Sequence, residues 1–383
     1  MNFILKTFLN ATYFIADKMM PNGRTLYIGR GQEQIFGYST LLYSLELAQL
    51  FLKKNFFEKK ITKLLKLLTH FQRKDGSFPL VLNENEKNLS FHQTLSSKAL
   101  PGWYLYNTIF DYLPFAGVYL FESYRISQNE NNNSGKKESF PGMKKEKNSE
   151  IVKGKTPTYE FCYAIPTSGK GYYSDELPIP FIVSKEKKDI TPIYGGDPYL
   201  EKIITPELIP LPYGTLEKSN FKQHLIYWLQ FKANLKFSHW GYHLYYSKLR
   251  KKDILPFFFA NQLRYKKIYN GFSGTNLFIT HTRKFNFLKK EITVFDKIVL
   301  KRKISFNEFY IINLFVFPGE ILRGKNSLII ENTKFTLKIE PIEGDVEFKE
   351  QISPLGKLLW IKEKIKQNNK ESIYNRKITI ILK

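Results

Sequence analysis

Apolar residues in the first third of the chain recur at the three- and four-residue spacing of amphipathic helices. This pattern predicts helices over residues 3–19, about 32–55, 57–72 and about 104–126. The tripeptide Pro21-Asn22-Gly23 ends the first helix, and Pro114 is expected to kink the fourth or to delay its start. Long helices joined by loops in this way predict stacked αα-hairpins.

Residues 127–157 are polar, rich in Asn and Lys, and nearly free of apolar side chains. A segment of this composition buries too little apolar surface to offset the entropy lost on folding. We therefore expect three parts: a helical domain at residues 1–128, a flexible linker or long loop at residues 129–157, and a second domain at residues 158–383.

From residue 158 the pattern changes to short β-branched and aromatic runs divided by Gly and Pro, which predicts strands. Strands are expected at residues 224–237, 240–249, 255–263, 276–283, 291–304, 308–317, 327–331, 334–340, 357–366 and 376–382. The run 219–237 fits a helix as well as a strand. Regular strand spacing favours an antiparallel β-sandwich, so the chain is predicted to be an α+β multidomain protein.

The net charge of the chain indicates which classes of partner it favours. Lys and Arg number 59 against 35 Asp and Glu, a formal net charge of +24. This balance favours an anionic partner such as nucleic acid, a membrane surface or an acidic glycan. The lysines are nevertheless spread along the whole chain, which is more typical of a solvated surface than of a dedicated groove.

The single cysteine, Cys162, excludes a disulfide framework and a Cys-based zinc site. It lies in the alternating run YEFCYAI, so we expect a packed core thiol and not a nucleophile. The N-terminal segment lacks a small-residue cleavage site, and no run reaches the about 18 apolar residues of a membrane-spanning helix. These features predict a soluble, cytoplasmic protein, and they do not set its oligomeric state.

Two arginines, Arg24 and Arg30, flank a loop that precedes the second predicted helix. Arg30 belongs to the segment GRGQEQIFG, residues 29–37, which leads into this helix. Backbone N–H groups at a helix N-terminus and two guanidinium groups can hold a carboxylate or a sulfate. The alternative is that Arg30 ties the loop to a carboxylate such as Glu33. The glycine spacing is not that of a dinucleotide-binding fingerprint.

A second group of candidates lies at the start of the fourth predicted helix. Tyr104 and Asn107 are three residues apart and share a helical face. An Asn amide can donate to a carboxylate, and a Tyr hydroxyl can pass a proton. A sugar ring can stack on Trp103 or Tyr104. The alternative is an aromatic belt that packs under the preceding loop.

Among the six histidines, His239 and His243 share one face of a predicted strand in HWGYH. No Asp or Glu lies near enough to complete a metal site, so we expect neither a metal nor a cofactor. These histidines are instead candidates for a proton shuttle. His281 and Arg283 are two residues apart and face one side of a strand, either as a cationic patch for a ligand or as ordinary sheet surface.

Motifs of other functional classes are absent from the sequence. The helical region holds Asp75, Asp111 and Glu122, but their spacing does not pair any two for glycoside hydrolysis. There is no G-x-S-x-G, no P-loop and no H-E-x-x-H. No helix-turn-helix or zinc-finger signature occurs either, so a nucleic-acid partner is not favoured.

Several segments together resemble the heparinase II/III-like group of polysaccharide-processing proteins. They are GRGQEQIFGY before a long helix, DGSFP in a loop, YN at the start of the next helix, and HWGYHLYYSKLR in the β-rich half. The resemblance implies an incomplete α/α toroid followed by an antiparallel β-sandwich, with an acidic polysaccharide bound in the cleft between them. It also implies lyase chemistry in which Tyr and His abstract the proton α to a uronate carboxylate, while Asn or Arg neutralises that carboxylate.

Transferred to this chain, the resemblance implies that Asn107 neutralises the substrate carboxylate and that Tyr106 or Tyr104 is the catalytic phenol. It implies that His243 or His239 is the base on the side of the sheet domain.

The sequence departs from the family in two ways. The helical part ends near residue 128, which is short for a toroid, and the family's His-x-Asp step is missing because Leu244-Tyr245 follow His243. We therefore expect a shortened, divergent relative that binds an anionic uronate polysaccharide. Whether it is also a lyase acting by β-elimination stays open; the alternative is a non-catalytic glycan-binding or surface-polysaccharide assembly protein.

Overall fold

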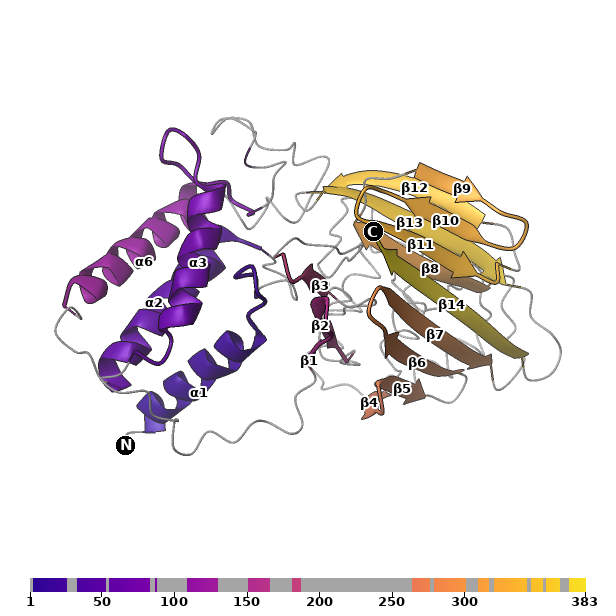
Figure 1. Cartoon of the computed structure of the whole chain (residues 1–383), viewed down its shortest axis with the longest axis horizontal. Coiled ribbons are helices and arrows are strands. Elements are labelled where there is room, and N and C mark those ends of the chain that lie inside the picture. Colours follow the sequence, from indigo (N-terminus) through magenta and orange to yellow (C-terminus); the bar gives the residue numbers. More distant parts are fainter. Residues whose placement is uncertain are drawn as a thin grey trace, which may run out of the picture.

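The structure is a computed structural model of the chain (Figure 1). It describes residues 3–25, 33–52, 55–82, 87, 109–129, 151–165, 181–186, 264–275, 279–300, 309–316, 320–342, 346–353, 356–365 and 372–383. In this part of the chain four helices come first and antiparallel strands follow. The predicted α+β class is therefore confirmed.

The helices are α1 (Phe3–Lys18), α2 (Ile35–Leu52), α3 (Glu58–Phe71) and α6 (Ile109–Asn129). Each overlaps a predicted range. Pro114 lies in the second turn of α6, and the helix continues beyond it. The predicted start of this helix, residues 104–108, lies outside the described residues.

The helices pack around α2, which contacts α1, α3 and α6. Their shared core holds Leu9, Ala16, Tyr38, Leu41, Leu45, Leu64, Leu68 and Phe71. On another side of α2, the ring of Phe36 lies 5.3 Å from that of Tyr112 of α6, measured between centroids. Because α2 is packed on several sides, apolar residues run around its whole circumference.

By length and composition alone α2 is apolar enough to span a membrane, whereas the sequence pattern predicted no such run. Half of this stretch, 50%, is buried inside the molecule. A buried core helix meets the same criterion, and the contacts of α2 with three other helices account for its apolar character.

Three antiparallel sheets are present among the described residues. The first contains β1 (Ile151–Lys155), β2 (Tyr159–Ala164) and β3 (Phe181–Ser184). The largest has the strand order β4-β5-β6-β7-β14-β11-β10-β9. Its strands are β4 (Arg264–Ile268), β5 (Gly271–Thr275), β6 (Ile279–Phe287), β7 (Glu291–Leu300), β14 (Ser372–Leu382), β11 (Phe335–Glu340), β10 (Leu328–Glu331) and β9 (Glu320–Arg323). The third contains β12 (Val346–Ser353), β13 (Gly356–Ile365) and β8 (Phe309–Val316).

Every strand predicted from residue 276 onward is present, whereas β2, β3, β4, β5, β9 and β12 were not among the predicted strands. Strand β1 lies inside residues 129–157, the range predicted as a linker. It forms because it pairs with β2, and Lys153 makes a 3.1 Å ion pair with Glu160 across the two strands. The predicted strands at residues 224–237, 240–249 and 255–263 lie outside the described residues.

One face of the eight-stranded sheet, which we call the inner face, is buried. A row of cross-strand partners runs over it from Phe285 through Val294, Ile378 and Ile339 to Leu328. Rings of β2 pack on this end of the sheet, Tyr163 against Phe285 and Phe161 stacked on Phe287, and Val346 of β12 packs against the same core. Cys162 is 0% exposed in this core, which confirms its prediction as a packed thiol.

Candidate functional site

Next to the apolar row, the inner face carries a buried ion pair. Arg283 of β6 lies directly opposite Asp296 of β7. Two hydrogen bonds join them: Arg283 Nε donates to Asp296 Oδ1 at 2.6 Å, and Nη2 donates to Oδ2 at 2.7 Å. Both side chains are 1% exposed. A buried charge is stable only when it is paired, so this contact also holds the register of β6 on β7.

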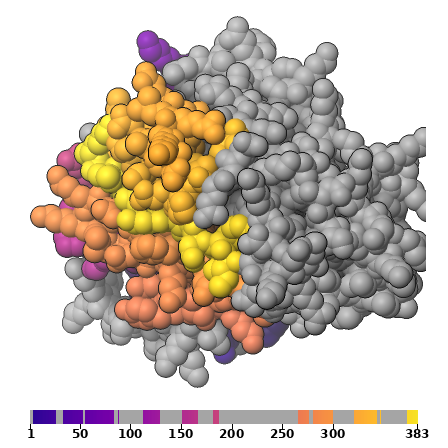
Figure 2. All heavy atoms as spheres, turned by 90° about the vertical axis from the view of Figure 1, so that its right-hand side faces the viewer, coloured from indigo at the N-terminus to yellow at the C-terminus, as the bar shows by residue number. Residues whose placement is uncertain are grey.

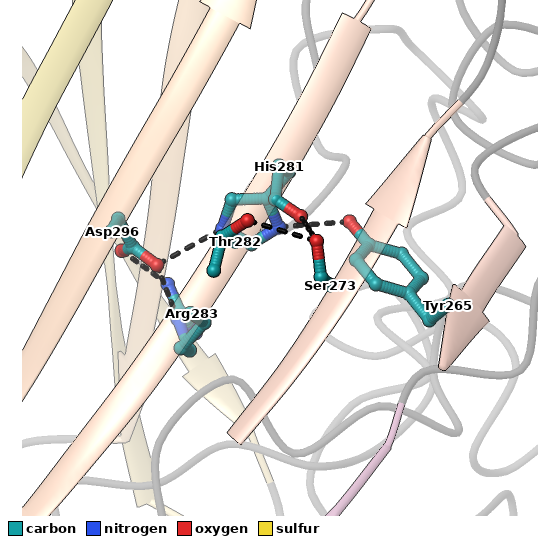
Figure 3. A network of polar contacts seen from close by, with 6 residues as sticks. All are labelled: Tyr265, Ser273, His281, Thr282, Arg283 and Asp296. Carbon is teal, nitrogen blue, oxygen red and sulfur yellow. Dashed lines mark hydrogen bonds and ion pairs between the residues drawn. The ribbon is translucent and has the colours of Figure 1, made fainter. Parts of the chain in front are cut away.

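His281 connects this ion pair to a tyrosine on β4 (Figure 3). Its Nε2 is 3.0 Å from Asp296 Oδ1, and its Nδ1 is 2.9 Å from Tyr265 Oη. An ionised carboxylate can only accept, so the geometry assigns the ring proton to Nε2 and makes Nδ1 the acceptor for the Tyr265 hydroxyl. We call the hydrogen-bonded series Tyr265, His281 and Asp296 the relay.

Gly274 allows Tyr265 to reach His281 across an intervening strand. Tyr265 and His281 are both register partners of Gly274, one on each side of β5. A Cβ at position 274 would meet Cδ1 of the Tyr265 ring at 2.6 Å, closer than non-bonded carbons approach. The missing side chain therefore leaves room for the phenol to lie over β5.

Burial and charge together set the protonation of the relay. Burial lowers the pKa of His281, while the hydrogen bond to Asp296 acts in the opposite direction. Burial alone would raise the pKa of Asp296, but the charge of Arg283 and the hydrogen bond from His281 outweigh it and hold that pKa well below its usual range. At neutral pH the carboxyl is therefore ionised and the imidazole is neutral, which agrees with the hydrogen-bond directions.

A second arginine adjoins this group. Arg376 of β14 is the register partner of Asp296 on the side away from β6, and it is buried. The row Arg283, Asp296 and Arg376 thus crosses three adjacent strands.

The structure brings the predicted residues His281 and Arg283 together on one face, as their spacing indicated. The face is the buried one, so the pair is not an exposed cationic patch and not ordinary sheet surface. The physical reason is Asp296, which neutralises Arg283 from the neighbouring strand.

Sequence reasoning missed Tyr265 and Asp296. For Asp296 a signal exists: in EITVFDKIVL it takes an inward position in the alternating series Ile292, Val294, Asp296, Ile298. A lone carboxylate at such a position requires a cationic or hydrogen-bonding partner on an adjacent strand. No comparable signal marks Tyr265, because its role depends on the register of β4, β5 and β6.

Arg24 lies in a different cluster, in the helical region. Its guanidinium forms an ion pair with Glu33 and donates to the carbonyl oxygen of Leu82 at 3.0 Å. The hydroxyl of Tyr38 donates to Glu33 Oε1 at 2.9 Å. Glu33 is the carboxylate considered above as a partner of Arg30, and here Arg24 holds it. The ligand-binding role of Arg24 stays a prediction.

The remaining predicted site residues lie outside the described residues: Tyr104, Tyr106, Asn107, His239, His243, Arg30 and Trp103. Their roles stay predictions.

Two of the carboxylates considered for hydrolysis lie in separate places. Asp75 accepts hydrogen bonds from the backbone and side chain of Ser77 at 2.9 and 2.7 Å in a turn. Glu122 pairs with Arg125 at 3.0 Å on α6. Across the described ranges, no three His, Cys, Asp or Glu side chains are grouped as metal ligands.

Comparisons with known proteins give a distant likeness to solved structures. The chain matches no protein family and no curated protein. Among solved structures it is similar to a mutant of the heparan sulfate lyase HepC from Pedobacter heparinus, with a TM-score of 0.37 and 9% sequence identity. The match covers 98% of this chain and 56% of that chain, so this chain spans little more than half the length of the solved protein. A TM-score of this size does not establish a common fold.

Proposed function

We propose that the protein binds an anionic, uronate-containing polysaccharide and cleaves it by β-elimination, with Tyr265 as the sheet-side base. The observation that carries the proposal is the relay, in which a phenol, an imidazole and a carboxylate are hydrogen-bonded in series. Tyr265 takes the place that the family resemblance assigned to His239 or His243. Its side chain is half-buried, whereas His281 and Asp296 are 1% exposed, so Tyr265 is the end of the relay that a substrate can approach.

A phenol abstracts a proton at neutral pH only when a neighbouring group accepts its own proton. Nδ1 of His281 presents a lone pair to Tyr265 Oη at 2.9 Å. Asp296 holds the opposite ring nitrogen and stabilises the imidazolium that forms. This is the same division of roles between nucleophile, base and orienting carboxylate that acyl-transfer triads use, with a phenol in place of a serine.

The proposed step balances without a cofactor. The phenol proton of Tyr265 moves to His281, and the phenolate removes the proton from the carbon α to the uronate carboxylate. The electron pair forms a carbon–carbon double bond as the glycosidic C–O bond at the β carbon breaks. On the helical side, we propose that Tyr106 or Tyr104 gives a proton to the leaving oxygen and that Asn107 faces the substrate carboxylate.

The proposal includes an architecture. The helices are taken as part of an incomplete α/α toroid, and the eight-stranded and third sheets as the two layers of a β-sandwich, with the substrate in the cleft between toroid and sandwich. The contact of Val346 with the core under the inner face supports the sandwich.

A non-catalytic glycan-binding protein is the second candidate, and one observation favours it. Arg283 already neutralises Asp296 through two hydrogen bonds, which weakens the hold of Asp296 on an imidazolium. If this effect dominates, the relay stabilises the sheet and the protein binds its polysaccharide without cleaving it.

The two candidates are separated by turnover. The full chain is incubated with a panel of uronate polysaccharides, and the ultraviolet absorbance of the unsaturated product is followed. Tyr265→Phe is expected to lower the rate by about 10²- to 10⁴-fold, the range typical of a lost general base. Tyr269→Phe is the matched control, because Tyr269 lies four residues along the chain and is 89% exposed. A wild-type protein that cleaves no substrate of the panel, or a Tyr265→Phe variant with the full rate, would overturn the lyase.

A further inference from the structure

The opposite face of the eight-stranded sheet, which we call the outer face, carries lysines that the relay does not use. Four of them project from four different strands and form what we call the basic patch: Lys266 of β4, Lys284 of β6, Lys297 of β7 and Lys377 of β14. Lys266, Lys284 and Lys297 are exposed, and Lys377 is half-buried. Atoms of these strands, orange to yellow in Figure 2, form a continuous part of the molecular surface.

Strand register places the patch in two neighbouring rows. In one row Lys284, Phe295 and Lys377 are successive cross-strand partners. Strands are about 4.8 Å apart, so the two lysines originate roughly 10 Å from each other. The ring of Phe295 lies between them and is 45% exposed, which offers an apolar surface inside a cationic frame.

In the other row Lys266 and Lys297 enclose two hydroxyl side chains, Ser273 and Thr282. These hydroxyls are hydrogen-bonded to each other at 2.8 Å, and each retains capacity for a further bond. The row continues to the exposed amide of Asn375. Polar groups able to donate and accept therefore lie between the charges.

Among the described residues, no carboxylate neutralises the charge of the patch in place. Among the described residues of these two rows, the first carboxylate is Glu340 of β11, beyond Lys377, and Glu340 pairs with Lys338 at 2.5 Å. No ion pair to any lysine of the patch is present in the described part of the sheet. The basic surface is thus segregated by strand order, although lysines are spread evenly along the sequence.

We propose that the outer face is a docking surface for an anionic polysaccharide, separate from the relay on the inner face. The ammonium groups attract the polyanion, the hydroxyl and amide groups bond to sugar hydroxyls, and Phe295 contacts the apolar face of a sugar ring. The identity of this partner rests on the proposed function. The surface would hold one part of a long polysaccharide while another part of that polysaccharide is in the catalytic site. It therefore raises the affinity for polymers and not for short oligosaccharides.

The side chains favour a polysaccharide over a nucleic acid. Single-stranded nucleic acid is bound on platforms of several stacking aromatic rings. The two rows offer one aromatic ring, that of Phe295, among lysines, hydroxyl groups and an amide, so their described residues do not form such a platform.

Matched charge variants of the full chain test the surface. One carries Lys266→Ser, Lys284→Ser and Lys297→Ser. The control carries Lys6→Ser, Lys59→Ser and Lys66→Ser, which removes the same charge from exposed positions of α1 and α3. Heparin binding is titrated at one ionic strength, and circular dichroism checks that both variants keep their secondary structure.

The outer-face variant is expected to lose about tenfold in heparin affinity, the sum of several modest surface charges, and the control much less. Equal losses of heparin affinity in both variants would show that net charge alone binds heparin and would overturn the proposed docking role of the outer face. A loss for single-stranded DNA without a loss for heparin would overturn it in favour of a nucleic acid. Binding is measured without turnover, so a protein that binds heparin through this face but cleaves nothing upholds this inference while the lyase fails.

Discussion

An arginine, a carboxylate and a tyrosine form a buried cluster in each half of the described chain, but they are connected in a different order. In the helical region Arg24 and Tyr38 both contact Glu33 directly. The backbone N–H of Thr25 donates to Tyr38 Oη at 3.2 Å, and that of Leu82 donates to the Glu33 carbonyl at 2.7 Å. These bonds join three separate segments around α2, so the cluster stabilises the helical region, while a ligand-binding role of Arg24 stays a prediction.

In the sheet, a histidine lies between the tyrosine and the carboxylate. The Nδ1 atom of His281 can accept the phenol proton of Tyr265 while Asp296 holds the opposite ring nitrogen, and the helical cluster has no such acceptor between its tyrosine and its carboxylate. Access differs as well: Tyr38 is 0% exposed, whereas Tyr265 is half-buried. Order and access, not residue composition, distinguish a candidate site from a structural cluster.

The largest expected effect is on stability, from Asp296→Ala. This change removes the carboxylate that two nitrogens of Arg283 and one of His281 contact, and it leaves a buried guanidinium without that partner. Breaking a buried pair in this way lowers the free energy of unfolding by about 3–5 kcal/mol. Urea unfolding measures it. Asp296→Asn, which keeps the shape and an acceptor oxygen, should lose less, and equal values for the two variants would contradict the ion pair as described.

A pair of tyrosine variants sharpens the comparison. Tyr38→Phe removes the hydrogen bonds to Glu33 and Thr25 in a fully buried place, so it should lower the free energy of unfolding by about 1–3 kcal/mol and leave turnover unchanged. Tyr265→Phe should lower turnover by about 10²- to 10⁴-fold. Because it leaves the buried Nδ1 of His281 without its donor, it should also lower the free energy of unfolding by about 1–3 kcal/mol. A loss of turnover in Tyr38→Phe but not in Tyr265→Phe would make the helical cluster the site and the relay a structural cluster.

The smallest expected effect is the pH dependence of stability. Burial places the pKa of folded His281 below its ordinary 6.5, so between these two values the unfolded chain binds more protons. The free energy of unfolding should therefore fall as the pH drops below about 6.5, by at most about 1.4 kcal/mol per pH unit. The carboxyl of Asp296, whose pKa is also lowered, adds a separate loss only below 3.8. Urea unfolding of His281→Gln over this range should lack the upper slope, and an unchanged slope would assign it to another group.

The helices could be predicted closely because their signal is local. The ranges 3–19 and 57–72 agree within a residue with Phe3–Lys18 and Glu58–Phe71 at each end. Period-two spacing likewise placed His281 and Arg283 on one face. Local spacing does not say which face is buried, since that depends on what packs against the sheet.

The relay could not be predicted, because strand pairing brings its members together. Tyr265 reaches His281 only through the register of β4, β5 and β6 and the absence of a side chain at Gly274. The position of β14 between β7 and β11, which brings Arg376 opposite Asp296, joins segments far apart in the chain. Such contacts are set by tertiary packing, which sequence periodicity does not encode.

Nitrogen-15 NMR of the His281 ring in the full chain tests the relay most directly, since it needs no substrate. At neutral pH the relay predicts a neutral imidazole with its proton on Nε2, and an Nδ1 resonance that shifts when Tyr265→Phe removes the hydroxyl donor. A proton on Nδ1, an imidazolium at neutral pH, or an Nδ1 resonance that does not respond to Tyr265→Phe would contradict the account.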